Sequence, residues 1–86
     1  MLVVRSGSAA FSIASGGYVT LTIDVADSDG LEKLAVAGFS TGGVAITVAQ
    51  VQLSKSTGRV VMALNNTTNT QRSGTATVDV LCAAPL

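Results

Sequence analysis

The sequence predicts an all-β protein: a compact antiparallel β-sandwich, jelly-roll-like, of about six short strands. Apolar and polar residues alternate with a period of two through most of the chain, as in strands with one buried and one exposed face. Stretches rich in Gly, Ser, Thr, Asn and Asp interrupt this alternation at regular intervals, as turns do. No connection is long enough to carry a helical crossover between parallel strands, so the pairing is predicted to be antiparallel.

The first two strands are predicted over residues 8–14 and 18–25. Residues 8–14 place Phe11 and Ile13 on one face, and the glycine pair at residues 16–17 then permits a tight turn. In residues 18–25 one face carries Val19, Leu21, Ile23 and Val25, and the other carries Tyr18, Thr20, Thr22 and Asp24. This is the pattern of a strand with a core face and a wet face.

Residues 31–39 fit two interpretations. Leu, Glu, Lys and Ala favour helix, and Leu31, Leu34 and Ala35 would share a helical face, so residues 31–37 could form a helix. A mostly apolar strand is the preferred prediction, because the run is short and Gly38 interrupts it.

The fourth strand, predicted over residues 44–53, changes phase in its middle. Val44, Ile46 and Val48 share one parity, whereas Ala49, Val51 and Leu53 share the other. A β-bulge or a break near Val48 and Ala49 would bring both sets to the core side. A strand covered on both faces is the alternative.

Two further strands are predicted over residues 59–64 and 75–82, followed by a tail at residues 83–86. Both parities of residues 59–64 are apolar, so both faces of this strand are expected to be covered. In the last strand Ala76, Val78, Val80 and Cys82 are predicted to face inward, with Thr75, Thr77 and Asp79 outward. Cys82 is the only cysteine and is expected to be a buried free thiol.

The composition predicts a single domain, residues 1–86, that associates with copies of itself. Charged residues make up 12% of the chain, about half of the roughly 25% typical of soluble domains. So little charge over so short a chain leaves apolar surface for a partner. Nucleic acid is not an expected partner, because the net charge is zero and the basic residues are scattered. Membrane insertion is not expected either, since no apolar run approaches the roughly 20 residues that a span requires.

No enzymatic activity, cofactor or metal is predicted. The chain has no histidine, the commonest general base, and its serines therefore lack the usual activating partner. Asp24, Asp27, Asp29 and Glu32 form the one acidic cluster, for which calcium is the alternative to a solvated loop. The calcium-loop pattern fails because no acidic residue stands where its bidentate ligand belongs.

Four segments resemble a family of short domains at the ends of bacteriophage tail-fibre or receptor-binding-type proteins. They are a glycine turn before an alternating strand (GGYVTL, residues 16–21), an apolar strand ending in Gly-Phe (VAGF, 36–39), a strand leading to an Asn-Thr turn (VMALNNTT, 61–68) and a closing Thr/Val ladder (TATVDVL, 75–81). The resemblance implies a β-sandwich that forms a homotrimer, lies on the virion outside the cell, and is the terminal domain of a longer fibre protein. It also implies attachment to a bacterial surface.

We therefore expect a non-enzymatic module that self-assembles and binds a cell-surface glycan or protein through its loops. Binding residues concentrate on connections held by a rigid scaffold, and the candidate ligand-binding residues are Asp27, Asp29, Thr41, Asn65, Asn66, Asn69 and Arg72. The alternative is a purely structural domain, such as a capsid decoration or a fibre stem, without a receptor.

Overall fold

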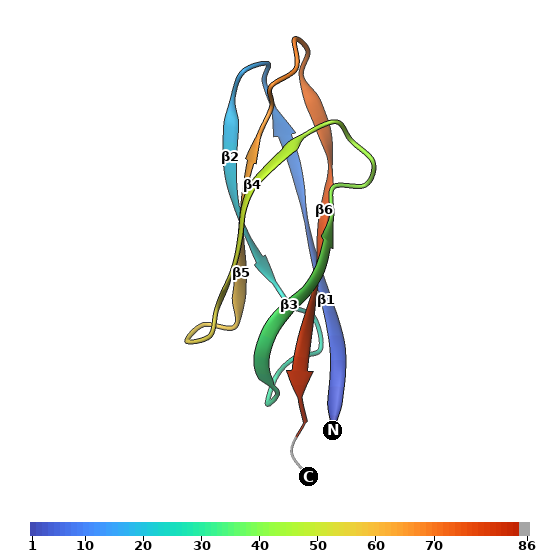
Figure 1. Ribbon diagram of the computed structural model, residues 1–86, viewed down its shortest axis with the longest axis vertical. Coiled ribbons are helices and arrows are strands. Elements are labelled where there is room, and N and C mark those ends of the chain that lie inside the picture. The colour runs from blue at the N-terminus through green and yellow to red at the C-terminus, as the bar shows by residue number, and fades with distance from the viewer. Residues whose placement is uncertain (85–86) are drawn as a thin grey trace.

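Two three-stranded antiparallel sheets make up the computed structural model, which describes residues 1–84 (Figure 1). Sheet A has the order β1-β6-β3, and sheet B has the order β2-β5-β4. The strands are β1 (Leu2–Ile13), β2 (Tyr18–Asp24), β3 (Glu32–Ser40), β4 (Thr47–Ser54), β5 (Arg59–Asn65) and β6 (Arg72–Ala83). The predicted all-β class and antiparallel pairing are confirmed. Of the predicted tail, residues 85–86 lie outside the described residues.

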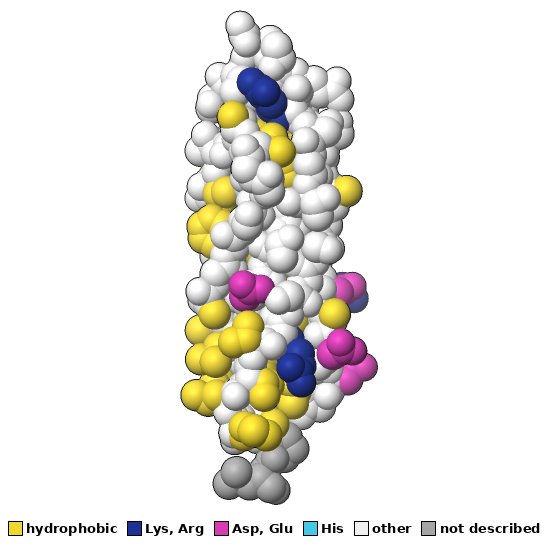
Figure 2. Space-filling view, turned by 90° about the vertical axis from the view of Figure 1, so that its right-hand side faces the viewer, with side chains coloured by type: hydrophobic (Ala, Val, Ile, Leu, Met, Phe, Trp, Pro, Cys, Tyr) yellow, Lys and Arg dark blue, Asp and Glu magenta, His cyan; other side chains and the backbone are white. Residues whose placement is uncertain are grey.

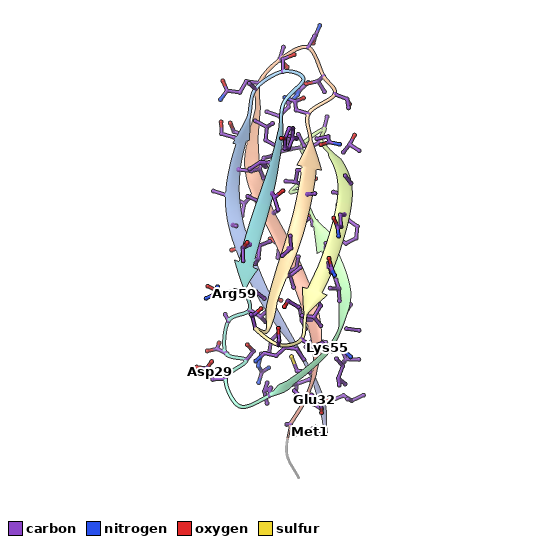
Figure 3. The ribbon with its side chains drawn as sticks, turned by 90° about the vertical axis from the view of Figure 1, so that its left-hand side faces the viewer. Met1, Asp29, Glu32, Lys55 and Arg59 are labelled. Atoms are coloured by element: carbon purple, nitrogen blue, oxygen red, sulfur yellow. The ribbon has the colours of Figure 1, made fainter. Side chains whose placement is uncertain are left out.

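The connections carry the chain back and forth between the two sheets. Only β4 and β5 are neighbours both in sequence and in one sheet, joined by a hairpin in which Gly58 N donates to Ser54 O (2.8 Å). The molecule is elongated, with principal extents of 50 × 22 × 15 Å. The β1–β2 and β5–β6 connections lie at its upper end, and the β2–β3 connection lies toward its lower end with Met1 (Figures 1 and 3).

The core lies between the inner faces of both sheets. Sheet B contributes Val60, Met62 and Leu64 from its central strand, and sheet A contributes Ala76, Val78, Val80 and Cys82 from its own, all fully buried. Burying one such Val, Leu or Met side chain contributes about 1.5–3 kcal/mol. The predicted inward set of the last strand is confirmed, as is the buried free thiol of Cys82.

Register irregularities resolve the two ambiguous segments. Residues 31–39 form a strand, not a helix, since Glu32–Ser40 pairs with β6 with shifts between Lys33 and Ala35 and between Val36 and Gly38. In β4 the register shifts between Val48 and Gln50, so Ala49 is the extra residue of a bulge. The predicted bulge is thus confirmed, although β4 begins at Thr47 rather than at residue 44.

Strand β1 is longer than the alternation predicted, because it begins at Leu2 rather than at residue 8. Two of the core-facing positions in its first half carry residues that interrupt the apolar alternation. Arg5 stands opposite Val80, and its Nε donates to the carbonyl of Asp27 (3.0 Å). Gly7 lies where a Cβ atom would overlap the backbone carbonyl of Asp24. The end of β2 therefore packs directly against β1, and Ala26 N donates to Ser6 O (2.9 Å).

Residues 1–84 cover only one face of β5. Its even-numbered residues are fully buried, whereas Val61 and Ala63 are half-buried on the outer face of sheet B. Val61 lies between Thr22 of β2 and Gln52 of β4. The sequence predicted that both faces of this strand are covered, but residues 1–84 leave its outer face partly exposed.

Candidate functional site

The predicted ligand-binding residues fall at three separate places. Asn65, Asn66, Asn69 and Arg72 lie in or beside the β5–β6 connection at the upper end (Figure 1). Thr41 lies in the β3–β4 connection, which projects from the side of the upper half. Asp27 and Asp29 lie in the β2–β3 connection, toward the lower end (Figure 3). On a molecule 50 Å long, one small ligand cannot contact all three places.

Asn66 is a structural residue, because its side chain is 1% exposed and fully hydrogen-bonded within the chain. Its Nδ2 donates to the carbonyls of Ile13 (2.9 Å), Ala14 (3.2 Å) and Thr70 (2.8 Å). Its Oδ1 accepts from the backbone N–H and the hydroxyl of Thr68 (3.0 and 2.5 Å). The amide thus ties the β1–β2 turn to the β5–β6 connection, and its nitrogen and oxygen are engaged within the chain rather than offered to a ligand.

The other candidates at the upper end differ in accessibility. Asn69 is exposed at the tip, and Arg72 is half-buried with its Nε donating to the hydroxyl of Thr68 (3.3 Å). Asn65 lies apart from both, at the end of β5 between Tyr18 and Thr47. Of the candidates predicted at this end, Asn69 and the guanidinium of Arg72 are therefore the ones that remain accessible to a ligand.

The β2–β3 connection, at the lower end, is fixed by hydrogen bonds within the loop, and its carboxylates face water. Ser28 is buried, and its hydroxyl donates to the carbonyl of Val25 (2.8 Å). Asp27 has a positive φ of 54°, a conformation that Asp tolerates better than most residues. The side chains of Asp27 and Asp29 are exposed. Within residues 1–84 no three carboxylate or thiol side chains gather closely enough to hold a metal ion.

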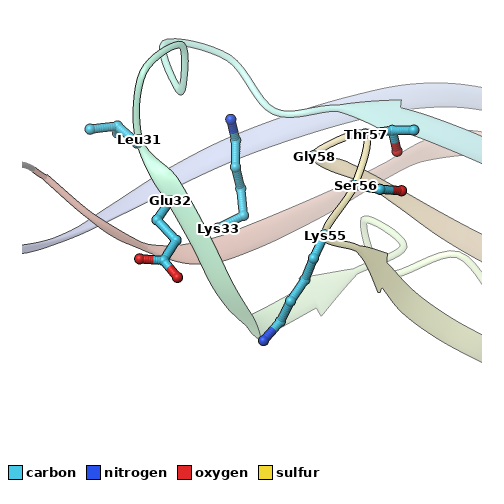
Figure 4. Close-up of a pocket in the computed structure, with 7 residues that line it drawn as sticks. All are labelled: Leu31, Glu32, Lys33, Lys55, Ser56, Thr57 and Gly58. Carbon is cyan, nitrogen blue, oxygen red and sulfur yellow. The ribbon is translucent and has the colours of Figure 1, made fainter.

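A shallow groove of about 300 Å³ separates this loop from the β4–β5 hairpin (Figure 4). Its lining residues are Leu31, Glu32, Lys33, Lys55, Ser56, Thr57 and Gly58. Figure 4 shows the two lysines pointing in different directions, and Lys33 Nζ is held by the carbonyl of Ser28 (2.9 Å). The charged groups therefore do not converge on one bound group. This groove was not predicted from the sequence, where its lining residues share only the feature that both lysines of the chain are among them.

The most distinctive surface is apolar and lies where β3 and β4 meet, which we term the β3–β4 side. The bulges place residues three apart on the core-facing side: Val36 and Phe39 in β3, and Val48 and Val51 in β4. Since β3 and β4 are edge strands of different sheets, these side chains are only partly covered. Leu53 is half-buried there as well, and Phe39 is 53% exposed.

Further apolar side chains are exposed at the lower end of sheet A. Met1, Leu2 and Val4 are all more than half exposed, and Leu81 stands beside Val4 on the same outer face. Figure 2 shows apolar side chains gathered along one margin and at the lower end of the face in view. Large apolar groups left on the surface in this way mark interaction sites in soluble proteins.

Residues 1–84 contain no helix that is long and apolar enough to cross a membrane. No family model, curated protein or solved structure matches the chain.

Proposed function

We propose that this protein is a non-enzymatic module that associates with copies of itself, in the manner of a bacteriophage tail-fibre domain outside the cell. A homotrimer is the favoured assembly. The two sheets would act as a β-sandwich with jelly-roll-like connections, since nearly every connection crosses between the sheets. The observation that carries the proposal is the partly uncovered β3–β4 side.

The β3–β4 side consists of core-facing apolar side chains that are partly exposed to water. Phe39 is 53% exposed beside half-buried valines that already contact the core. Each square ångström of apolar surface removed from water contributes about 25 cal/mol, so covering these side chains favours association. The outer face of sheet B makes a useful contrast, because Thr22, Gln50 and Gln52 face water there at little cost. Self-association is therefore proposed through the β3–β4 side.

Receptor binding is proposed for the loops at the ends of the molecule. Among the predicted candidates, Asn69 and Arg72 are accessible at the upper end, and Asp27 and Asp29 are exposed toward the lower end. Neither loop is a deep pocket, so a single copy would hold a surface glycan weakly. An oligomer presents each loop several times, and this multivalency raises the overall affinity without new contacts.

A purely structural role, as a capsid decoration or a fibre stem, is the second candidate. It is favoured by Asn66 and Thr68, whose polar groups are engaged within the upper loop rather than offered to a ligand. Glycan-array binding by the assembled protein, reduced by Arg72→Ala, would support the receptor-binding role. Absence of binding to both glycans and bacterial cells would favour the structural role.

Self-association is tested by Phe39→Asp, with Tyr18→Asp as the matched control. Both aromatic side chains are exposed, by 53% and 80% respectively, but only Phe39 lies on the β3–β4 side. We expect Phe39→Asp to weaken association at least about tenfold, because a carboxylate would have to be desolvated in the interface. Sedimentation equilibrium over a concentration series measures the effect. A monomeric wild-type protein at all concentrations, or equal effects of the two substitutions, would contradict the proposal.

A further inference from the structure

The free edge of β1 presents backbone hydrogen-bonding groups at its even-numbered residues. Met1 O accepts from Ala84 N (2.8 Å) and therefore faces β6. Ser6 O accepts from Ala26 N (2.9 Å) and faces away from β6. In an antiparallel ladder the residues of a strand alternate strictly between these two directions. The regular β1–β6 register thus directs the N–H and C=O groups of Ser8, Ala10 and Ser12 outward from the sheet.

Only the upper half of this edge remains available. In the lower half, Ala26 occupies the carbonyl of Ser6, and Arg5 Nη1 donates to the carbonyl of Val4 (3.4 Å). No described hydrogen bond uses the backbone groups of Ser8, Ala10 or Ser12 on the open side, and all three residues are exposed. In Figure 3 the upper half of β1, in pale blue, forms the left-hand margin of the molecule.

The other three edge strands carry features that discourage pairing with another strand. The edges β3 and β4 contain register shifts, and β2 ends in the charged pair of Asp24 with Arg59 (2.8 Å). Bulges and charges of this kind are common protections of sheet edges. Residues 8–12 of β1 contain no bulge, charge or proline. This edge is therefore the one open to addition of a further strand.

We propose that residues 8–12 of β1 pair antiparallel with the same residues of a second copy of this chain. A two-fold axis at Ala10 would place Ala10 opposite its own copy and Ser8 opposite Ser12 of the second copy. The two sheets A would then join into one continuous six-stranded sheet. This inference goes beyond the proposed function, since the contact lies on the β1 margin and not on the β3–β4 side.

The side chains of β1 identify the second copy as the fitting partner. On the outer face the order Ser8-Ala10-Ser12 is the same in both directions. Antiparallel self-pairing therefore places serine beside serine and alanine beside alanine. On the core-facing side the same register sets Phe11 opposite Ala9 of the second copy, on both sides of the axis. A large side chain thus meets a small one, which avoids crowding across the new pair.

The contact is small and its association is accordingly weak. Three residue pairs supply roughly six backbone hydrogen bonds, over about 17 Å of strand. A contact of this size lies at the low end of specific interfaces. It becomes effective when several copies act together, so it would join assemblies to one another rather than hold a single assembly together.

Amide hydrogen exchange of the wild-type protein at increasing concentration tests the pairing directly. The amides of Ala9 and Phe11 bond to β6 and serve as an internal measure of intact fold. We expect protection of Ser8, Ala10 and Ser12 to rise at least about tenfold from the lowest to the highest concentration. Protection that stays constant for these three amides would overturn the proposal. It would leave self-association through the β3–β4 side standing, because Phe39→Asp tests that separately.

A charge placed at the two-fold axis gives the second test. Ala10→Lys sets two ammonium groups against each other, and Lys is a natural guard of sheet edges. The matched control is Thr75→Lys, because Thr75 stands beside Ala10 on the same outer face but on the central strand. We expect Ala10→Lys to abolish the concentration-dependent protection and Thr75→Lys to preserve it. The Ala10→Glu variant by itself should also lack the concentration-dependent protection. Mixing the Lys and Glu variants should restore this protection. Protection that survives Ala10→Lys would overturn the proposal.

Discussion

At the scale of single residues, Asn66 decides the conformation of the upper end of the molecule. A buried amide without partners would cost about 1–3 kcal/mol for each unsatisfied group. Here the side chain instead replaces the hydrogen bonds that water would give to three carbonyl groups, from Ile13, Ala14 and Thr70. Two connections distant in sequence thereby become one rigid end. An Asn in a polar turn does not reveal this role in the sequence, because two of the three carbonyls, those of Ile13 and Ala14, are more than 50 residues away.

Replacing Asn66 should therefore destabilise the protein more than replacing a neighbouring Asn. We expect Asn66→Ala to lower the free energy of unfolding by about 2–4 kcal/mol, because it leaves one buried carbonyl and two part-buried carbonyls without this donor. Asn69→Ala, at an exposed position of the same loop, should change it by less than about 0.5 kcal/mol. Urea denaturation of the three proteins measures both effects. Equal stabilities of the two variants would refute the structural role.

At the scale of strands, alternation predicted most of the secondary structure but not the placement of the loops. The phase change in β4 was readable because Val48 and Val51 are both apolar. The first half of β1 was hidden, because its core-facing positions are occupied by Arg5 and Gly7. The groove between residues 31–33 and 55–58 could not be predicted. Two loops lie at the same end of the molecule only because of the way the strands cross between the sheets. Periodicity carries no information about that crossing.

The bulge in β4 makes a prediction about deletions. Ala49 has no partner in β5, so its removal leaves Val48, Val51 and Leu53 on the core-facing side. We expect deletion of Ala49 to change the free energy of unfolding by less than about 1 kcal/mol. Deletion of Gln52, from the regular part of the ladder, should cost more than about 3 kcal/mol, because it turns core side chains outward. Urea denaturation compares them, and similar losses would show that Ala49 is not the extra residue.

At the scale of the whole molecule, charge is expected to contribute little to the proposed association between copies. The chain has five basic and five acidic residues, and its Asp24–Arg59 ion pair is exposed. Exposed pairs of this kind contribute about 0–1 kcal/mol. The surfaces proposed for association consist of apolar side chains on the β3–β4 side and neutral backbone groups along β1.

Self-association should consequently be insensitive to sodium chloride. Between 50 and 500 mM salt, the dissociation constant measured by sedimentation equilibrium should change by less than about threefold, since screening acts on charges. Ammonium sulfate should strengthen association instead, because excluded salts favour burial of apolar surface. A steep loss of association in sodium chloride would point to a charged interface and count against both proposed surfaces.

The hydrogen bond from Ala84 N to Met1 O also determines how the molecule responds to mechanical load. A force that pulls these two residues apart acts along the hydrogen bonds between β1 and β6, which run across the strands in an antiparallel ladder. Such a force meets the bonds one after another, beginning at the loaded end, as a zipper opens. The pairing of β1 with β6 is thus expected to open at low force when Met1 and Ala84 are drawn apart.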